Sequence, residues 1–294
     1  MTSLKNMVRK FRKLGRKSKQ RKTHWSFKEI ELLTTEQIIS KLKHFGVPFD
    51  QRQFLADVEK FYSGEDLAEH WGQVYLITAQ GFDEDFIWMA AVVLWNRLAP
   101  HITHSEKLDD MMQEGYDLLG KKGQNNVRTK VCLLWLEVWE KIKERFSEDI
   151  RSIENTDRIF NGTQSLFNWC QDLEMELHNA GLEEAHFFER RIIYCQEFCR
   201  FFPESDDLIV HNMRRAEAES YFRLGKIEEG EQAFQSLIKD YPDNVWGYIG
   251  WGDEYCLKDA ERAEKIYKMA LEKNLEDRED VLDRLRSLED GELG

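Results

Sequence analysis

Residues 207–240 read DLIVHNMRRAEAESYFRLGKIEEGEQAFQSLIKD, and residues 244–273 read NVWGYIGWGDEYCLKDAERAEKIYKMALEK. The second stretch repeats the spacing of small and aromatic residues in the first. A small residue lets two helix backbones approach, and an aromatic residue fills the space beside it, so this spacing predicts paired helices. Pro242 separates the two units, because proline cannot continue a helix. The matching positions are Ala218 and Gly252, Tyr221 and Tyr255, Gly230 and Ala263, Phe234 and Tyr267, and Leu237 and Ala270.

The repeated spacing predicts the architecture of the chain. A helix–turn–helix unit of about 34 residues with small and aromatic residues at these positions resembles the tetratricopeptide repeat. Sustained alternation of apolar and polar residues, which marks strands, is missing, and the four prolines lie where helical patterns stop. We therefore expect an all-α protein, with an N-terminal helical module followed by a tetratricopeptide-like right-handed α-solenoid.

Four parts are expected along the chain. Residues 1–24 form a basic arm, 25–78 a small helical module, 79–206 a set of divergent helical hairpins, and 207–294 two tetratricopeptide-like repeats with a capping helix. A capping helix with a polar outer face is what the end of a solenoid requires.

Individual helices follow from capping residues and breakers. Thr34, Asp50 and Ser63 each stand three positions before a polar residue, which predicts three capped helices in the module. Gly181 is expected to turn one later hairpin. The expected module helices run near 34–45, 50–62 and 64–77, and the expected hairpins pair 84–99 with 105–119 and 164–179 with 182–201.

Three short segments carry a family resemblance: DDMMQ at 109–113, NWCQD at 168–172 and WGYIGW at 246–251. They are similar to segments of bacterial tetratricopeptide-repeat-like proteins, some of which carry a small SEC-C zinc-binding module. The resemblance covers roughly residues 80–290 and implies a helical-repeat fold, in a group whose function is uncharacterised. This chain has no Cys-x-Cys and no adjacent Cys pair, so the zinc site of that module is not implied here.

The charge of the chain is unevenly distributed. Residues 1–22 carry ten Lys or Arg and no acid, within a net charge of −13, so the remainder carries −23. An acidic body repels phosphates, which confines any nucleic-acid binding to the arm. The arm also places Leu4, Met7, Val8, Phe11 and Leu14 at helical spacing.

The arm admits several functions. It could be a solubilising tail, an RNA- or ribosome-binding segment, a contact with an anionic membrane, or a segment that folds onto the acidic surface of the protein itself. A transit peptide is disfavoured because lysine predominates and serine is scarce. The expected nucleic-acid contacts are Arg9, Lys10, Arg12, Lys13, Arg16 and Lys17.

The five cysteines are odd in number and lie inside apolar helical patterns. Buried free thiols are typical of a reducing compartment. No apolar run is long enough for a membrane span, and no hydrophobic signal core follows the basic start. We therefore expect a cytoplasmic protein.

The concave groove of the repeats is the expected binding site, with a protein or peptide as the partner. The first helix of each pair lines this surface in tetratricopeptide repeats. Asn and Arg side chains can hold a peptide backbone or carboxylate, and aromatic side chains provide anchoring area. The expected groove residues are Asn212, Arg215, Glu219, Phe222, Trp246, Ile249 and Asp253. Gly247 and Gly250 indicate a close approach to this helix by a neighbouring helix or by a ligand.

Enzymatic chemistry has weaker support. Asp109, Asp110 and Gln113 on one helix and Asp172 and Glu176 on another could form a polar cluster that binds a cation or performs acid–base catalysis. A solvated acidic face, or carboxylates paired with Arg214 and Arg215, is the interpretation that we favour for them.

Nucleotide-binding and hydrolase motifs are missing from the chain. The pairs Cys195–Cys199, Glu183–His186 and His101–His104 each lack the further ligands that a metal centre needs. We expect no metal and no cofactor, and a non-enzymatic adaptor as the function.

Overall fold

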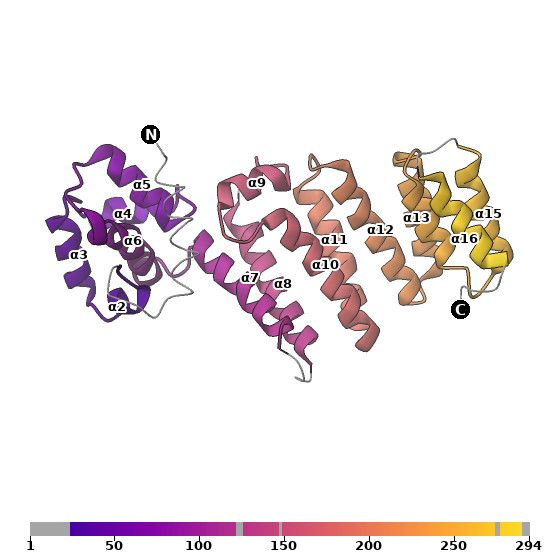
Figure 1. Ribbon diagram of the computed structural model, residues 1–294, viewed down its shortest axis with the longest axis horizontal. Coiled ribbons are helices and arrows are strands. Elements are labelled where there is room, and N and C mark those ends of the chain that lie inside the picture. Colours follow the sequence, from indigo (N-terminus) through magenta and orange to yellow (C-terminus); the bar gives the residue numbers. More distant parts are fainter. Residues whose placement is uncertain (1–23, 122–125, 147–148, 274–276, 290–294) are drawn as a thin grey trace. The chain divides into compact units, whose positions relative to one another are not determined.

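The computed structural model describes residues 24–121, 126–146, 149–273 and 277–289. Every regular element in these ranges is a helix, so the all-α prediction is confirmed for them (Figure 1). The basic arm, including its six expected nucleic-acid contacts, lies outside the described residues, apart from His24. No helix in the described ranges combines the length and apolarity needed to cross a membrane.

The chain divides into two compact units. The N-terminal unit comprises residues 1–114, 138–145 and 157–165, and the C-terminal unit comprises residues 115–137, 146–156 and 166–294. Three helices contribute residues to both units: α7 (Ser105–Leu119), α8 (Val127–Arg145) and α9 (Ile153–Phe160).

Short capped helices begin the N-terminal unit. They are α2 (Phe27–Glu31), α3 (Thr35–His44), α4 (Gln51–Val58) and α5 (Gly64–Val74), followed by the 3₁₀ turn η1 (Gly81–Asp83) and α6 (Glu84–Leu98). The expected caps are present: the side chains of Thr34, Asp50 and Ser63 each accept a hydrogen bond from the backbone N–H three residues later. Ser26, which the sequence did not single out, forms a complete capping box with Glu29.

Helix α6 occupies the centre of the N-terminal unit. It is apolar around its circumference, and its residues from Phe86 to Trp95 are mostly buried. A helix of that kind has no polar face to offer to solvent and is surrounded by other elements. It packs against α5, α2 and α3. The expected pairing of 84–99 with 105–119 is therefore not the principal packing of this helix, and its core crosses the expected boundary at residue 79.

The C-terminal unit continues as a series of longer helices. They are α10 (Leu166–Glu183), α11 (His186–Phe201), α12 (Asp207–Arg223), α13 (Ile227–Asp240), α14 (Val245–Asp253), α15 (Ala260–Leu271) and α16 (Arg278–Glu289). Each contacts the next helix along the chain, and α10 also contacts α12, α12 contacts α14, and α14 contacts α16 (Figure 1). The even-numbered helices therefore form one row along this unit.

Small residues in this unit make room for rings, as the repeat pattern predicts. A Cβ atom on Gly252 would lie 2.2 Å from Tyr267 Cε1, and one on Gly230 would lie 2.4 Å from Phe222 Cδ2. Gly181 does the same for the Phe188 ring, at 2.7 Å, and lies inside α10. The turn expected at Gly181 instead falls at residues 184–185, because the glycine serves close packing and α10 continues past it.

Candidate functional site

The even-numbered helices of the C-terminal unit present a polar surface that we call the inner row. It is formed by side chains of α10, α12, α14 and α16, together with Arg191 of α11. Five of the expected groove residues lie on this row with part of their surface exposed: Asn212, Arg215, Glu219, Trp246 and Asp253.

Arg215 is the most accessible charged group at the centre of the row. Its guanidinium lies 5.9 Å from the centre of the Trp246 ring, and its Nε lies 3.4 Å from a Glu219 oxygen. No described residue accepts a hydrogen bond from its terminal N–H groups, and its buried Nε makes no hydrogen bond either. A cation–π contact at this distance helps to position the guanidinium and leaves its terminal donors available.

Gly250 explains how Arg215 reaches this position. A Cβ atom at Gly250 would lie 3.0 Å from Arg215 Cδ and 3.2 Å from Cγ, so the glycine lets the arginine stem cross α14 closely. A Cβ atom at Gly247 would lie 3.1 Å from Ile238 and 3.4 Å from His211. Of the two explanations for these glycines, close contact with neighbouring helices accounts for both.

A buried ion pair lies beneath the row. Arg191 Nε donates to Glu174 at 2.6 Å, its terminal nitrogens reach Glu219 at 3.2 Å and Ser220 Oγ at 3.1 Å, and its side chain is only 5% exposed. Burial raises the pKa of Glu174, and the charge of Arg191 opposes that shift. Sequence reasoning missed Arg191, because it lies on an odd-numbered helix outside the expected lining positions.

Asp253 closes the row at α14. Its carboxylate accepts a hydrogen bond of 2.6 Å from the Tyr267 hydroxyl and lies 3.1 Å from Arg284 of α16. The adjacent Glu254 is buried, and burial raises its pKa while Arg223, 3.4 Å away, opposes the shift. Through these contacts Asp253 links α14 to α15 and α16, and Glu254 links the end of α14 to α12.

Two residues that were expected to contact a ligand in the groove lie in the core instead. Phe222 and Ile249 are buried in the core of the C-terminal unit, at 4% and 2% exposed, so they offer no surface to a ligand. Phe222 packs against the rings of Phe234 and Tyr255. Among the aromatic and aliphatic residues expected in the groove, only Trp246 is partly exposed.

Asp109 and Gln113 of the expected polar cluster are bound within the N-terminal unit. Asp109 is buried and accepts hydrogen bonds from the Thr163 hydroxyl and from the Gln164 backbone N–H, the latter at 2.8 Å. Gln164 also donates to the side chain of Gln113 at 2.8 Å. Asp109 thus fixes the segment that leads into α10, while the neighbouring Asp110 is exposed.

Asp172 and Glu176 are bound within the C-terminal unit. Asp172 accepts a hydrogen bond of 2.5 Å from the Tyr116 hydroxyl, and burial together with this carboxylate raises the pKa of Tyr116. Glu176 is buried beside Arg128, whose Nε lies 3.6 Å from it. A local hydrogen bond therefore accounts for Asp172, whereas Glu176 has a basic neighbour but keeps one buried carboxylate oxygen without a hydrogen bond among the described residues.

Metal-binding geometry is absent from the described part of the chain. In residues 24–121, 126–146, 149–273 and 277–289, no group of three or more His, Cys, Asp or Glu side chains is placed to hold an ion. Burial raises the pKa of Cys199 to about 12, and it also raises that of Cys195, so both thiols stay protonated. His104 is buried between Glu106, at 3.0 Å, and Asn96, at 3.0 Å.

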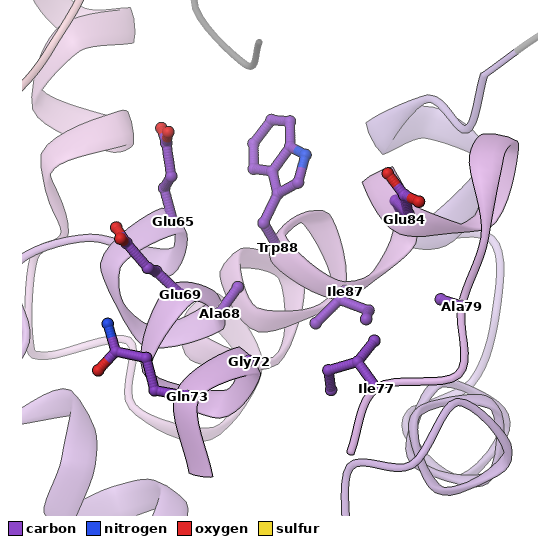
Figure 2. A pocket seen from close by; sticks show the side chains of 10 residues that line it. All are labelled: Glu65, Ala68, Glu69, Gly72, Gln73, Ile77, Ala79, Glu84, Ile87 and Trp88. Carbon is purple, nitrogen blue, oxygen red and sulfur yellow. The ribbon is translucent and has the colours of Figure 1, made fainter. Parts of the chain in front are cut away.

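A separate cavity lies in the N-terminal unit, and we call it the α5–α6 pocket. It has a volume of about 440 Å³, an apolar floor and an acidic rim (Figure 2). Ala68 and Gly72 of α5, Ile77 and Ala79 of the connecting segment and Ile87 of α6 form the floor.

The rim of the pocket is formed by charged and aromatic side chains. Glu65 and Glu69 rise from α5 on one side, Glu84 lies at the start of α6 on the other, and Trp88 stands between them in Figure 2. Gln73 completes the lining. None of the lining residues is basic. No local sequence pattern indicated this pocket, because its residues come from two helices whose packing was not expected.

No protein-family model, curated protein or solved structure matches this chain.

Proposed function

We propose that the protein is a non-enzymatic adaptor that binds an extended peptide segment of a partner protein on the inner row. The Arg215 guanidinium carries this proposal. It is held over Trp246, about a quarter exposed at 28%, and its terminal N–H groups have no acceptor among the described residues. Such donors suit a peptide carbonyl or carboxylate.

We also propose that the C-terminal unit is a tetratricopeptide-like right-handed α-solenoid, related to the bacterial family that the sequence resembles. Contacts between alternate helices support this proposal, because in such repeats the first helices of successive pairs line one surface. The matched packing of Gly230 with Phe222 and of Gly252 with Tyr267 supports it as well.

The ligand chemistry follows from Arg215 and its partly exposed neighbours Asn212, Glu219 and Trp246. Asn212 and Arg215 would hold backbone carbonyls, and Trp246 would provide an aromatic face for one side chain of the peptide. Glu219 lies 3.4 Å from Arg215, which disfavours a strongly acidic ligand at that point. We place this activity in the cytoplasm, since all five cysteines are free and a reducing compartment suits them.

A peptide-display selection against the purified full-length protein tests the proposal. Selected peptides would be titrated by fluorescence anisotropy against wild type, Arg215→Ala and Arg214→Ala. Arg214 is the matched control, because it is the adjacent arginine of α12 and bonds Asp240 and Ser236 away from the row. Loss of a central anchor costs about 2 kcal/mol, or roughly thirtyfold in Kd.

The two arginine variants give opposite expectations. Arg215→Ala should weaken binding about thirtyfold, and Arg214→Ala should leave Kd within about twofold. Trp246→Ala should weaken binding in the same way as Arg215→Ala. If the selection returns no peptide, or if both arginine variants bind equally well, the inner row is not a peptide site. RNA that copurifies with the full-length protein and is released as salt rises would instead favour the arm as the functional element.

A further inference from the structure

We propose that the basic arm, residues 1–22, binds in the α5–α6 pocket of the same chain. The pocket belongs to the N-terminal unit and shares no residue with the inner row. Three features of the described residues identify the arm as its occupant: the charge of the rim, the chemistry of the floor, and the point at which the described chain begins.

The rim requires a cationic occupant. Glu65, Glu69 and Glu84 line the pocket, and no lysine, arginine or histidine lines it. Glu65 and Glu84 stand in the first turns of α5 and α6, where the helix N-terminus stabilises a negative charge. Glu69 stands further along α5, is half-buried, and has no ion-pair partner among the described residues. Its charge is therefore the one that an occupant would neutralise.

The floor requires apolar groups from the same occupant. It consists of alanine, isoleucine and glycine, and a Cβ atom at Gly72 would meet nothing within 4 Å. Trp88 adds an indole whose buried Nε1 has no acceptor in the described part of the chain. Buried indole N–H groups generally have a partner, and a backbone carbonyl of the occupant would supply one.

The arm combines both chemistries. It carries ten Lys or Arg and no acid, together with Leu4, Met7, Val8, Phe11 and Leu14 at helical spacing. A segment with apolar groups on one face and cations on the other would place the first on the floor of the pocket and the second at its rim. Aromatic rings at such a site also attract cations, and Trp88, which contacts the Phe27 ring edge-to-face, lines the pocket.

The residues that follow the arm in the sequence lie beside the pocket. His24 Nδ1 lies 2.9 Å from Asp85, and Trp25 Nε1 donates to Asp83 at 2.9 Å. These two acids flank Glu84, which lines the rim. His24 and Trp25 are therefore held by the sequence neighbours of Glu84, at the end of η1 and the start of α6. At about 1.5 Å of rise per helical residue, the 22 residues that precede them are long enough to reach across a pocket of this size.

Tethering favours the arm over any separate basic peptide. A short flexible connection gives an effective concentration in the millimolar range, so a free basic segment must bind with much higher affinity to displace the arm. A docked arm would also keep its cations from nucleic acid. The same contacts would weaken as salt rises, because rim carboxylates exposed to solvent are screened.

Limited trypsin digestion of the full-length protein tests the proposal. The arm holds ten cleavage sites, and mass spectrometry would follow the first cut within residues 1–22. A synthetic peptide of residues 1–22 gives the rate for an unprotected arm. The variants are Glu69→Lys and Glu69→Gln, with Glu114→Lys as the control. Glu114 is an exposed residue of α7 that does not line the pocket, and its replacement changes the net charge equally.

A docked arm predicts slow cleavage in wild type at low salt, about tenfold slower than in the free peptide. Glu69→Lys should accelerate the cut about fivefold, Glu69→Gln about twofold, and Glu114→Lys should match wild type. At about 1 M salt the variants should converge. Cleavage of wild type at the rate of the free peptide would overturn the proposal. So would equal protection in wild type and Glu69→Lys, or equal acceleration by Glu69→Lys and Glu114→Lys.

Discussion

Replacing Arg191, which is buried beneath the inner row, by methionine should destabilise the C-terminal unit by about 3 kcal/mol at pH 7. The side chain is 5% exposed and contacts both Glu174 and Glu219. Methionine preserves most of the volume, so the effect isolates the charge. Breaking a buried ion pair costs about 3–5 kcal/mol, and the partial exposure of the two carboxylates places this case at the lower end.

Glu174 bears most of that cost. Glu219 keeps Arg215 at 3.4 Å, whereas no other basic group is within salt-bridge distance of Glu174 in the described chain. The expected loss corresponds to a fall of about 6–12 °C in melting temperature for a unit of this size. Urea unfolding followed by circular dichroism would measure it. Arg190→Met, which changes the exposed neighbour on α11, is the matched control and should stay within about 0.5 kcal/mol of wild type.

The pH dependence of this variant has a definite sign. Burial raises the pKa of Glu174, and Arg191 opposes the shift, so removing Arg191 should raise that pKa further. Below the pKa of the unfolded chain the carboxyl group is protonated in both states, and no unpaired charge is buried. The destabilisation by Arg191→Met should therefore be smallest near pH 4 and should grow as pH rises through the folded pKa.

A second variant refines the same test. Arg191→Met combined with Glu174→Gln should recover about half of the lost stability, because the amide needs no counter-charge. If Arg191→Met unfolds with the same free energy as Arg190→Met, or if its loss does not depend on pH, the buried pair does not stabilise the unit in the way argued.

Four further substitutions can be measured by the same unfolding assay. Burial and the nearby arginines lower the pKa of His211 to about 4, so wild-type stability should fall as pH drops from 6.5 to 4, by up to about 3 kcal/mol, and His211→Leu should flatten that fall. Gly252→Ala should cost about 2–3 kcal/mol through its clash with the Tyr267 ring, whereas Gly72→Ala, with open space around it, should stabilise α5 by about 0.5–1 kcal/mol. Arg145→Ala should cost about 2–3 kcal/mol, because its guanidinium donates to backbone carbonyls at the end of α4, including that of Val58 at 3.0 Å.

The sequence predicted helices well where a single capping side chain marks the start of the helix. Thr34, Asp50 and Ser63 cap helices as expected, because an N-cap depends on residues three positions apart. The contact between Gly252 and Tyr267 was predictable because the small residue and the aromatic residue recur at the same positions of the repeat. The short helices α2 and α9 were not expected, since five and eight residues are too few for a clear periodic pattern.

Packing between distant segments was not predictable in the same way. The local sequence of an apolar helix does not show whether the helix pairs with the next one in a hairpin or lies at the centre of a core. Helix α6 lies at the centre of a core. Gly181 shows the same limit: a glycine near the end of a helical pattern indicates a turn, but here it admits Phe188. The α5–α6 pocket and Arg191 both depend on such packing, which is why neither was expected.

Glu219 connects the buried pair to the proposed peptide site. It lies 3.2 Å from Arg191 and 3.4 Å from Arg215, so it balances one buried and one half-exposed cation. A ligand that accepts hydrogen bonds from the terminal N–H groups of Arg215 need not break either contact, because no described residue accepts a hydrogen bond from them. A ligand carboxylate would add a second negative charge close to Glu219. We therefore expect Glu219→Gln to shift the preference of the row from neutral to acidic peptides. The ratio of the Kd values for neutral and acidic peptides should change more than the Kd for neutral peptides itself.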